Sequence, residues 1–260
     1  MKILEHFNIT QLEADIDCVL LKLNSEEKDI FLSKLPDDFR KCYVTDKKLK
    51  NNISKLRLSK KEIIQSYIPK PGNVMSGEFG EIISYFLLKE KYLPLELRGP
   101  KKWRSKIDSE RPIQYSDIVL FYKKDASKPS KDDLIVTAES KMKATRDTRN
   151  HPIQNALNGS IDDSTRRLAI TLTWLRERAI KKSKQNNIDY LDRFIKPVAF
   201  GAYKKDFKAI AIIDMRLLDD EIEKDLDTDN CVDDLELIII TMDNLKAIYE
   251  ETYQSIPETV

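Results

Sequence analysis

Residues 133–141 read DLIVTAESK, and this stretch decides the fold that we expect for the 260-residue chain. Its first part is a short apolar run with β-branched residues, which is typical of a buried strand. Residues 115–122, YSDIVLFY, form a second such run, and the polar stretch 127–132 between the two has the composition of a turn. We therefore expect two neighbouring strands that are joined like a hairpin.

Around this pair, segments with helical periodicity alternate with further short apolar runs. Helices are expected at residues 76–91, 163–183 and 187–195 and after Asp243, and strands at 198–203, 208–214 and 235–242. This alternation indicates an α/β fold, because each helix can cover a face of the sheet that its neighbouring strands build. The expected architecture is a mixed sheet flanked by helices.

The N-terminal seventy residues read as a small α/β unit of their own. We expect a strand at 16–23 and helices at 26–35 and 59–67, the first of them ending before Pro36. Ser59 and Glu62 have the spacing of a capping box. The loop at 70–73, KPGN, is the expected boundary. The prediction is an N-terminal domain for partner contact or regulation at 1–70 and a second domain at 71–260.

The charge of the chain is nearly balanced but unevenly distributed. The sum of 45 Lys and Arg against 44 Asp and Glu is +1, which alone argues against nucleic-acid binding. However, residues 41–61 hold eight basic residues and one acid, and residues 166–184 hold seven and one. Residues 214–236 hold eleven acids and two basic residues. Basic clusters near one site can bind phosphate groups, so nucleic acid remains a candidate partner.

The cysteine and histidine content excludes several classes of protein. Cys18, Cys42 and Cys231 are widely separated, which argues against a disulfide framework and a cysteine-based zinc site. The two histidines, His6 and His151, are too few for a multi-histidine metal centre. No apolar run approaches the roughly 18 residues of a membrane span. We expect a cytoplasmic protein that does not cross a membrane.

Glu139 and Lys141 are the candidate chemical centre. Four pairs in the chain fit the pattern acid-x-Lys, and only this pair closes an apolar strand. Because strand side chains alternate with a period of two, both point to the same face. Asp117 opens the neighbouring strand and should lie beside Glu139. Two carboxylates and a backbone carbonyl suit Mg²⁺ or Mn²⁺, and Lys141 can orient a water and stabilise charge on a phosphate.

A helix can bring a third acid to the same place. Glu78 and Glu81 lie three residues apart in the expected helix, so they share a side, and either one can complete the site. Gly77 and Gly80 allow that helix to approach a neighbouring backbone closely. The alternative interpretation of all these acids is a sheet edge with ordinary salt-bridged carboxylates.

The order of these residues resembles that of the PD-(D/E)xK nuclease superfamily, over roughly residues 73–215. An acid on a helix (Glu81 or Glu78) is followed by Asp117 and then by Glu139-x-Lys141. More narrowly, the segments GEFGE, SDIVLF and AESK resemble the nuclease subunit of Hachiman anti-phage defence, which works with a helicase partner. The resemblance implies a restriction-endonuclease-like fold and hydrolysis of DNA phosphodiesters with bound Mg²⁺. Ser116 departs from the proline in the superfamily name.

The resemblance also implies roles for the site residues. The implied catalytic residues are Glu81, Asp117, Glu139 and Lys141, and the implied metal ligands are Asp117 and Glu139, with Glu78 as a further candidate. Basic residues near the site in sequence are candidates for DNA contacts: Lys101, Lys102, Arg104, Lys143, Arg146 and Arg149. Trp103 can stack on a base or serve as a partly buried anchor. For Arg166 and Arg167, a solvated face and a DNA contact remain equally open.

The expected function is that of a metal-dependent DNA nuclease, the effector of an anti-phage system with a helicase partner. Two alternatives stay open. The chain can be a stand-alone restriction-type endonuclease, which would cut a defined sequence without a partner. It can also be a non-catalytic nucleic-acid-binding or assembly subunit that kept the fold.

Overall fold

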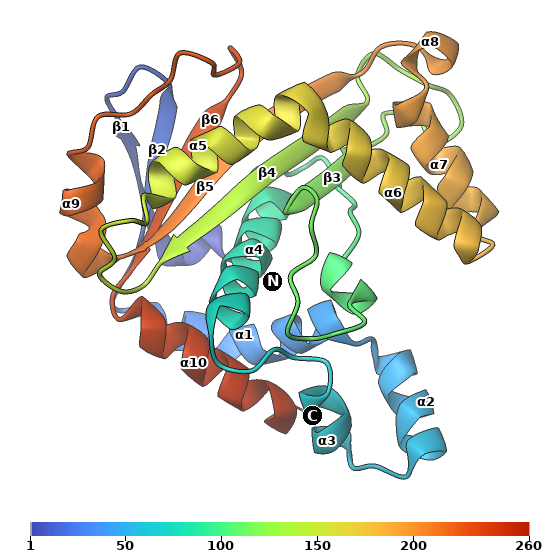
Figure 1. Ribbon diagram of the computed structural model, residues 1–260, viewed down its shortest axis with the longest axis horizontal. Helices are drawn as coiled ribbons and strands as arrows, with labels where there is room; N and C mark the ends of the chain where they lie inside the picture. The colour runs from blue at the N-terminus through green and yellow to red at the C-terminus, as the bar shows by residue number, and fades with distance from the viewer. Residues whose placement is uncertain (1, 260) are drawn as a thin grey trace.

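The computed structural model describes residues 2–259 and has a six-stranded mixed sheet at its centre, with helices on both faces (Figure 1). The spatial order is β1-β2-β6-β5-β4-β3. The four inner strands run parallel to one another, and the two edge strands are antiparallel to their neighbours. The strands are β1 (Phe7–Leu12), β2 (Asp17–Leu23), β3 (Ile118–Tyr122), β4 (Leu134–Lys143), β5 (Lys204–Asp214) and β6 (Glu236–Met242).

Ten α-helices surround the sheet in the described part of the chain. They are α1 (Lys28–Tyr43), α2 (Asp46–Leu56), α3 (Lys60–Gln65), α4 (Asn73–Lys91), α5 (Pro152–Asp162), α6 (Leu168–Lys181), α7 (Gln185–Ile195), α8 (Pro197–Phe200), α9 (Leu218–Ile222) and α10 (Leu245–Ser255). Short 3₁₀ turns occur at Leu4–His6, Lys102–Ser105, Met215–Leu217 and Ile256–Glu258, and a π turn at Asp163–Arg167 joins α5 to α6. Within residues 2–259, no helix combines the length and the apolar character that crossing a bilayer requires.

Strand β6 and most of β5 are buried on both faces because helices cover both. Side chains alternate along β5, so Ile210 and Ile212 pack in the layer that contains α1, α4 and α10. Ala209 and Ala211 face the opposite layer, where α5 lies across the sheet (Figure 1). This arrangement confirms the expected α/β fold with a mixed sheet between helices.

The contact between α4 and β4 depends on one glycine. A Cβ atom at Gly80 would lie 3.2 Å from Ser140 Oγ and 3.6 Å from Met142 Cβ, so α4 approaches β4 closely at this point. Gly77 has no atom within 4 Å of such a Cβ. The expectation of a close approach is therefore confirmed for Gly80 and wrong for Gly77.

The N-terminal seventy residues are not separated from the rest, contrary to the boundary expected between 1–70 and 71–260. Strand β2 pairs in parallel with β6 from Asp17↔Glu236 to Lys22↔Thr241, which places the N-terminal strands in the same sheet. One apolar core also contains residues from both parts, such as Ile3 and Ile238. The KPGN loop was misleading because a local turn signal carries no information about which strands pair.

Three other local predictions were wrong. Helix α1 continues through Pro36, because burial of Phe31, Leu35 and Phe39 outweighs the roughly 3 kcal/mol cost of an internal proline. The expected strand at 198–203 is largely replaced by α8, where proline occupies the first helical position and Val198 is fully exposed. The helix expected from residue 163 begins as a π turn instead, and the preceding α5 was not predicted.

Candidate active site

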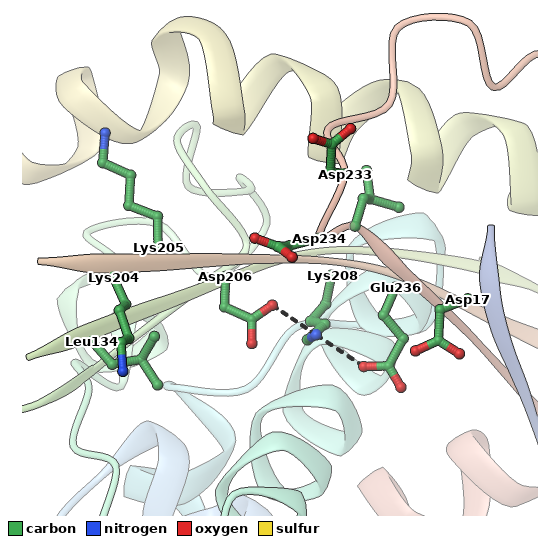
Figure 2. A pocket seen from close by; sticks show the side chains of 10 residues that line it. Asp17, Leu134, Lys204, Lys205, Asp206, Lys208, Asp233, Asp234 and Glu236 are labelled. Carbon is green, nitrogen blue, oxygen red and sulfur yellow. Dashed lines mark ion pairs between the residues drawn. The ribbon is translucent and has the colours of Figure 1, made fainter. Parts of the chain in front are cut away.

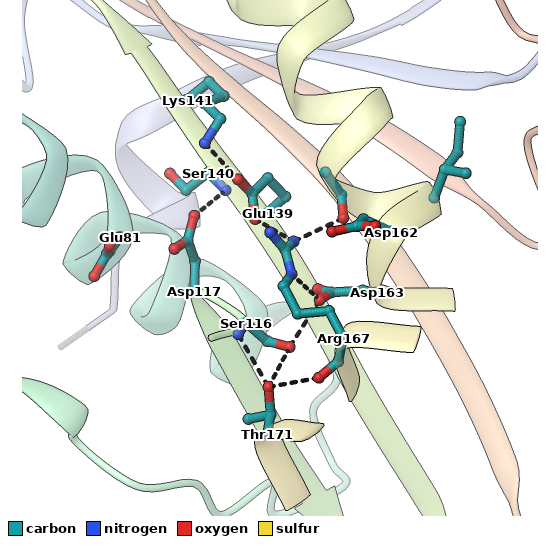
Figure 3. A network of polar contacts seen from close by, with 12 residues as sticks. Glu81, Ser116, Asp117, Glu139, Ser140, Lys141, Asp162, Asp163, Arg167 and Thr171 are labelled. Carbon is teal, nitrogen blue, oxygen red and sulfur yellow. Dashed lines mark hydrogen bonds and ion pairs between the residues drawn. The ribbon is translucent and has the colours of Figure 1, made fainter. Parts of the chain in front are cut away.

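Asp117 and Glu139 meet where β3 begins. The two strands pair in the register Ile118↔Ala138, which brings Asp117, one residue before β3, to the level of Glu139. Asp117 Oδ2 accepts a hydrogen bond of 3.0 Å from the backbone N–H of Ser140 (Figure 3). The carboxylate thus takes the place of a backbone acceptor where the ladder ends. The sequence prediction that the two acids are neighbours agrees with this placement.

Two cationic side chains hold the buried Glu139 carboxylate. The Lys141 ammonium donates to one of its oxygens and the Arg167 guanidinium to the other (Figure 3). Glu139 is 3% exposed, whereas Lys141 is half-buried on the same face of β4. Helix α5 leaves room for this carboxylate at Gly159, where a Cβ atom would lie 2.3 Å from Glu139 Cγ. Any larger residue at this position would displace the acid.

A shell of polar contacts fixes Arg167 in turn. Arg167 Nε donates to Asp163 Oδ1 at 2.6 Å, and the Ser116 hydroxyl donates to the same oxygen at 2.7 Å. The Ser116 backbone N–H donates to Thr171 Oγ1 at 3.1 Å. Among the described residues, no hydrogen-bond partner is found for the buried Asp163 Oδ2. Residues from the segment before β3, the π turn and α6 therefore act together to orient the guanidinium toward Glu139.

Glu81 approaches from α4, on the other side of Asp117. Lys102 Nζ lies 3.2 Å from Glu81 Oε2 and 3.2 Å from Asp117 Oδ1, so one buried ammonium bridges two carboxylates. Trp103 Nε1 donates a hydrogen bond of 2.8 Å to Glu81. Trp103 is 3% exposed, which supports its interpretation as a buried anchor and not as a base-stacking residue.

Glu78 has different partners from Glu81. Its oxygens accept from the Tyr43 hydroxyl at 2.7 Å and from Lys106 Nζ at 2.5 Å. The Tyr43 hydroxyl is in turn 2.6 Å from that of Tyr253, inside the core. Only Glu81 shares a cation with Asp117, so the contacts favour Glu81 over Glu78 as the helix-borne acid of the site.

The carboxylates differ in how readily they ionise. Burial, together with the charge of Asp117, raises the pKa of Glu139 to about 7. Burial also raises the pKa of Glu81 to about 8, although Lys102 opposes the shift. Burial acts on Asp117 as well, but Lys102 and Lys141 hold its pKa below the usual range. Carboxylates so close together compete for ionisation, and a bound cation would relieve this competition.

The residues of the site fit a divalent metal ion. Asp117 and Glu139 offer the hard oxygen donors that Mg²⁺ prefers. The Ser140 carbonyl faces the same strand edge as its N–H group, which bonds Asp117, so it offers a third oxygen. Among residues 2–259, no group of three or more acidic, histidine or cysteine side chains is arranged to hold a metal. Two carboxylates and waters are nevertheless the donor set that Mg²⁺ commonly uses.

Two of the six predicted DNA contacts are wrong because the side chains are buried. Lys102 belongs to the site itself, between Glu81 and Asp117. Lys143 is 6% exposed and donates to Glu221 Oε1 at 2.7 Å. The remaining four candidates are exposed or half-buried, and stay predictions: Lys101, Arg104, Arg146 and Arg149. Closeness in sequence to the site did not reveal which lysines the fold would bury.

The sequence prediction missed Gly159 and left Arg167 undecided. Arg167 follows Glu139 by 28 residues and reaches it only because α5 packs across β4. A glycine within α5 is the one local signal, since an internal helical glycine usually has a packing reason.

A cavity of about 690 Å³ lies away from these residues, near the amino ends of β4, β5 and β6 (Figure 2). Lys208 Nζ lies there between Asp206 Oδ1 at 2.7 Å and Glu236 Oε2 at 2.9 Å. Lys91 also pairs with Glu236 at 2.7 Å. These charges neutralise one another, so the cluster links the starts of β5 and β6 to the end of α4.

A family model named HamA matches residues 1–256 of the chain. The match therefore includes the whole sheet, the helices on both faces and every site residue described above. No curated protein matches the chain.

Proposed function

The chain belongs to the HamA family, that of a Hachiman anti-phage defence subunit, and from this premise we propose that it is a metal-dependent nuclease that hydrolyses DNA phosphodiesters. The observation that carries the proposal is the convergence of Asp117, Glu139 and Lys141 on adjoining strands, with Glu81 arriving from α4. This is the arrangement expected for the PD-(D/E)xK superfamily. The position of this site within the family match supports a role in defence.

Each residue has a distinct part in the proposed reaction. Asp117 and Glu139 would hold the metal, which when bound would polarise the phosphate and make a bound water more acidic. The Lys141 ammonium orients the attacking water and stabilises charge that develops on the phosphate oxygens. Arg167 fixes the Glu139 carboxylate, and Lys102 with Glu81 fixes Asp117. The buried shell around Arg167 preorganises the donors before the substrate arrives.

We also propose that the nuclease acts in a complex with a helicase, which releases or directs its activity. The support for this part is the family membership. A stand-alone restriction-type enzyme is the first rival and would cut a defined sequence without a partner. A non-catalytic subunit is the second rival and would bind nucleic acid without cutting it, and its binding would be insensitive to EDTA.

Incubation of labelled DNA with the full chain, alone and with its helicase partner, separates these functions. The proposal predicts cleavage in Mg²⁺ or Mn²⁺, none in EDTA, and recovery when the metal is restored. Binding without cleavage under any of these metals, with and without the partner, would establish the non-catalytic rival. A unique cut site for the chain alone would establish the restriction-type rival.

A further inference from the structure

A second groove, of about 470 Å³, lies along α6 and α7 beside residues 98–105. Five basic residues line it, and no acidic residue of the described chain does: the basic residues are Arg98, Lys102, Arg178, Lys182 and Lys184. Three aromatic residues, Phe121, Trp174 and Tyr190, also belong to its walls. A lining that combines basic side chains with aromatic rings suits a polyanion that also carries flat ring systems.

The groove ends at the candidate active site. Lys102 belongs to both, because it lines the groove and bridges Glu81 and Asp117. Trp174 stacks on Tyr115 at 4.7 Å, and Tyr115 stands two residues before Asp117. Tyr115 has a φ of 119°, a conformation that costs on the order of 1–3 kcal/mol outside glycine and clusters at functional sites. The stack therefore couples the groove wall to the entry of the catalytic strand.

Three of the five cations of the groove are not neutralised within the described chain. The other two are paired, Arg98 with Glu96 and Lys102 with Glu81 and Asp117. Among residues 2–259, no carboxylate lies within 4.0 Å of the cationic groups of Arg178, Lys182 or Lys184. Partial burial lowers the pKa of Lys182, and the charges of Arg178, Lys48 and Lys184 lower it further. These groups repel one another, so an anion that covers them gains free energy that the protein itself does not supply.

We propose that this groove binds the phosphate backbone of a single nucleic-acid strand and leads it to Asp117 and Glu139. The inference rests on the proposed function, which supplies a phosphodiester substrate at the end of the groove. Cations with interspersed aromatic rings are the combination that single strands use, whereas a duplex hides its base faces. Lys182 and Lys184, both exposed and beyond the catalytic residues, contact phosphates without sequence preference.

Binding of a fluorescein-labelled oligothymidine to the full chain in EDTA tests the groove apart from catalysis. Fluorescence anisotropy is measured over a range of salt concentrations for the wild type and for the double variant Lys182→Ala/Lys184→Ala. The control Lys22→Ala/Lys246→Ala removes two exposed lysines from β2 and α10. Loss of two phosphate contacts on a single strand should reduce the slope of log K against log salt by about 1.4. At 0.1 M salt, this reduction of the slope corresponds to roughly 25-fold weaker binding by the groove variant than by the wild type.

Each other outcome overturns the inference. Equal affinity and slope for the wild type and the groove variant would contradict it, as would an equal loss in the control or no binding by the wild type at low salt. Tighter binding of a duplex of the same length would contradict the single-strand assignment. Because no metal is present, weakened binding of the groove variant supports the groove even if the chain never cuts. Conversely, binding by the variant that equals wild-type binding would refute the proposed role of the groove. The proposal of metal-dependent cleavage would not be affected by that result.

Discussion

Glu139 is the buried acid at the place where we propose that the metal binds. Its carboxylate has a cation on each side, Lys141 and Arg167, yet its pKa is raised to about 7 by burial and by Asp117. The acid is thus close to an even mixture of charged and neutral forms at neutral pH. Metal binding requires the charged form and must release the proton.

This titration predicts a pH-dependent metal affinity. Below about pH 7 Glu139 is protonated, so the apparent affinity for Mn²⁺ should fall about fivefold from pH 7 to pH 6 and approach tenfold per unit below that. Isothermal titration calorimetry of the full chain measures it directly. Constant affinity between pH 6 and pH 8 would mean that Glu139 does not ligate the metal.

Arg167 should influence the pKa of the Glu139 carboxylate, and its neighbour Arg166 provides a matched control. Arg167 lowers the pKa of Glu139, so Arg167→Gln should move the pH midpoint of Mn²⁺ binding upward. It should also reduce the stability by a few kcal/mol, because Asp163 and Glu139 lose a partly buried partner. Arg166 is exposed and pairs with Asp162, so Arg166→Gln should leave the midpoint unchanged. Equal midpoints for both variants would exclude a positioning role for Arg167.

Sequence reasoning at the residue scale worked where the strand period decides the geometry. Asp117, Glu139 and Lys141 were placed together because alternation and strand adjacency fix their common face. The choice between Glu81 and Glu78 was not predictable, since it depends on where the turn at Lys102–Ser105 packs. Contacts between segments that are distant in sequence cannot be predicted from local sequence patterns.

At the scale of elements, the packing of α5 on β4 fixes the shape of the site. Helix α5 is one of the elements that sequence patterns missed, as are β1 and α2, although most of the apolar strands were found. It begins at Pro152, and its apolar side is short, with Ile153, Ala156 and Leu157 buried. A strand in the core, by contrast, shows an uninterrupted apolar run that is easily recognised.

Two helical glycines should respond in opposite ways to the same substitution. Gly159→Ala places a Cβ atom 2.3 Å from Glu139 Cγ and should destabilise the protein by about 1–3 kcal/mol, with loss of cleavage. Gly77→Ala meets no atom within 4 Å, so it should stabilise α4 by about 0.5–1 kcal/mol. Urea denaturation compares them. A stable, active Gly159→Ala variant would show that α5 does not pack on the acid as described.

At the scale of the whole molecule, the net charge of +1 hides a separation of opposite charges. The basic groove follows α6 and α7, whereas the acidic segment 214–236 includes α9, which lies far from α7 (Figure 1). The uneven distribution was visible in the sequence. The pairing of β2 with β6 was not, because it joins segments more than 200 residues apart. The described strands from both ends of the chain consequently build one sheet, which forms a continuous framework around the site.

The central claim is that Asp117, Glu139 and Lys141 form a metal-dependent nuclease centre. The most direct measurement is the rate of DNA cleavage in Mg²⁺ by the full chain with its helicase partner, for wild type, Glu139→Ala, Lys141→Ala and the exposed-acid control Glu13→Gln. We expect each site variant to lose at least about 100-fold in rate and the control to match the wild type. Wild-type rates for both Glu139→Ala and Lys141→Ala would contradict the account.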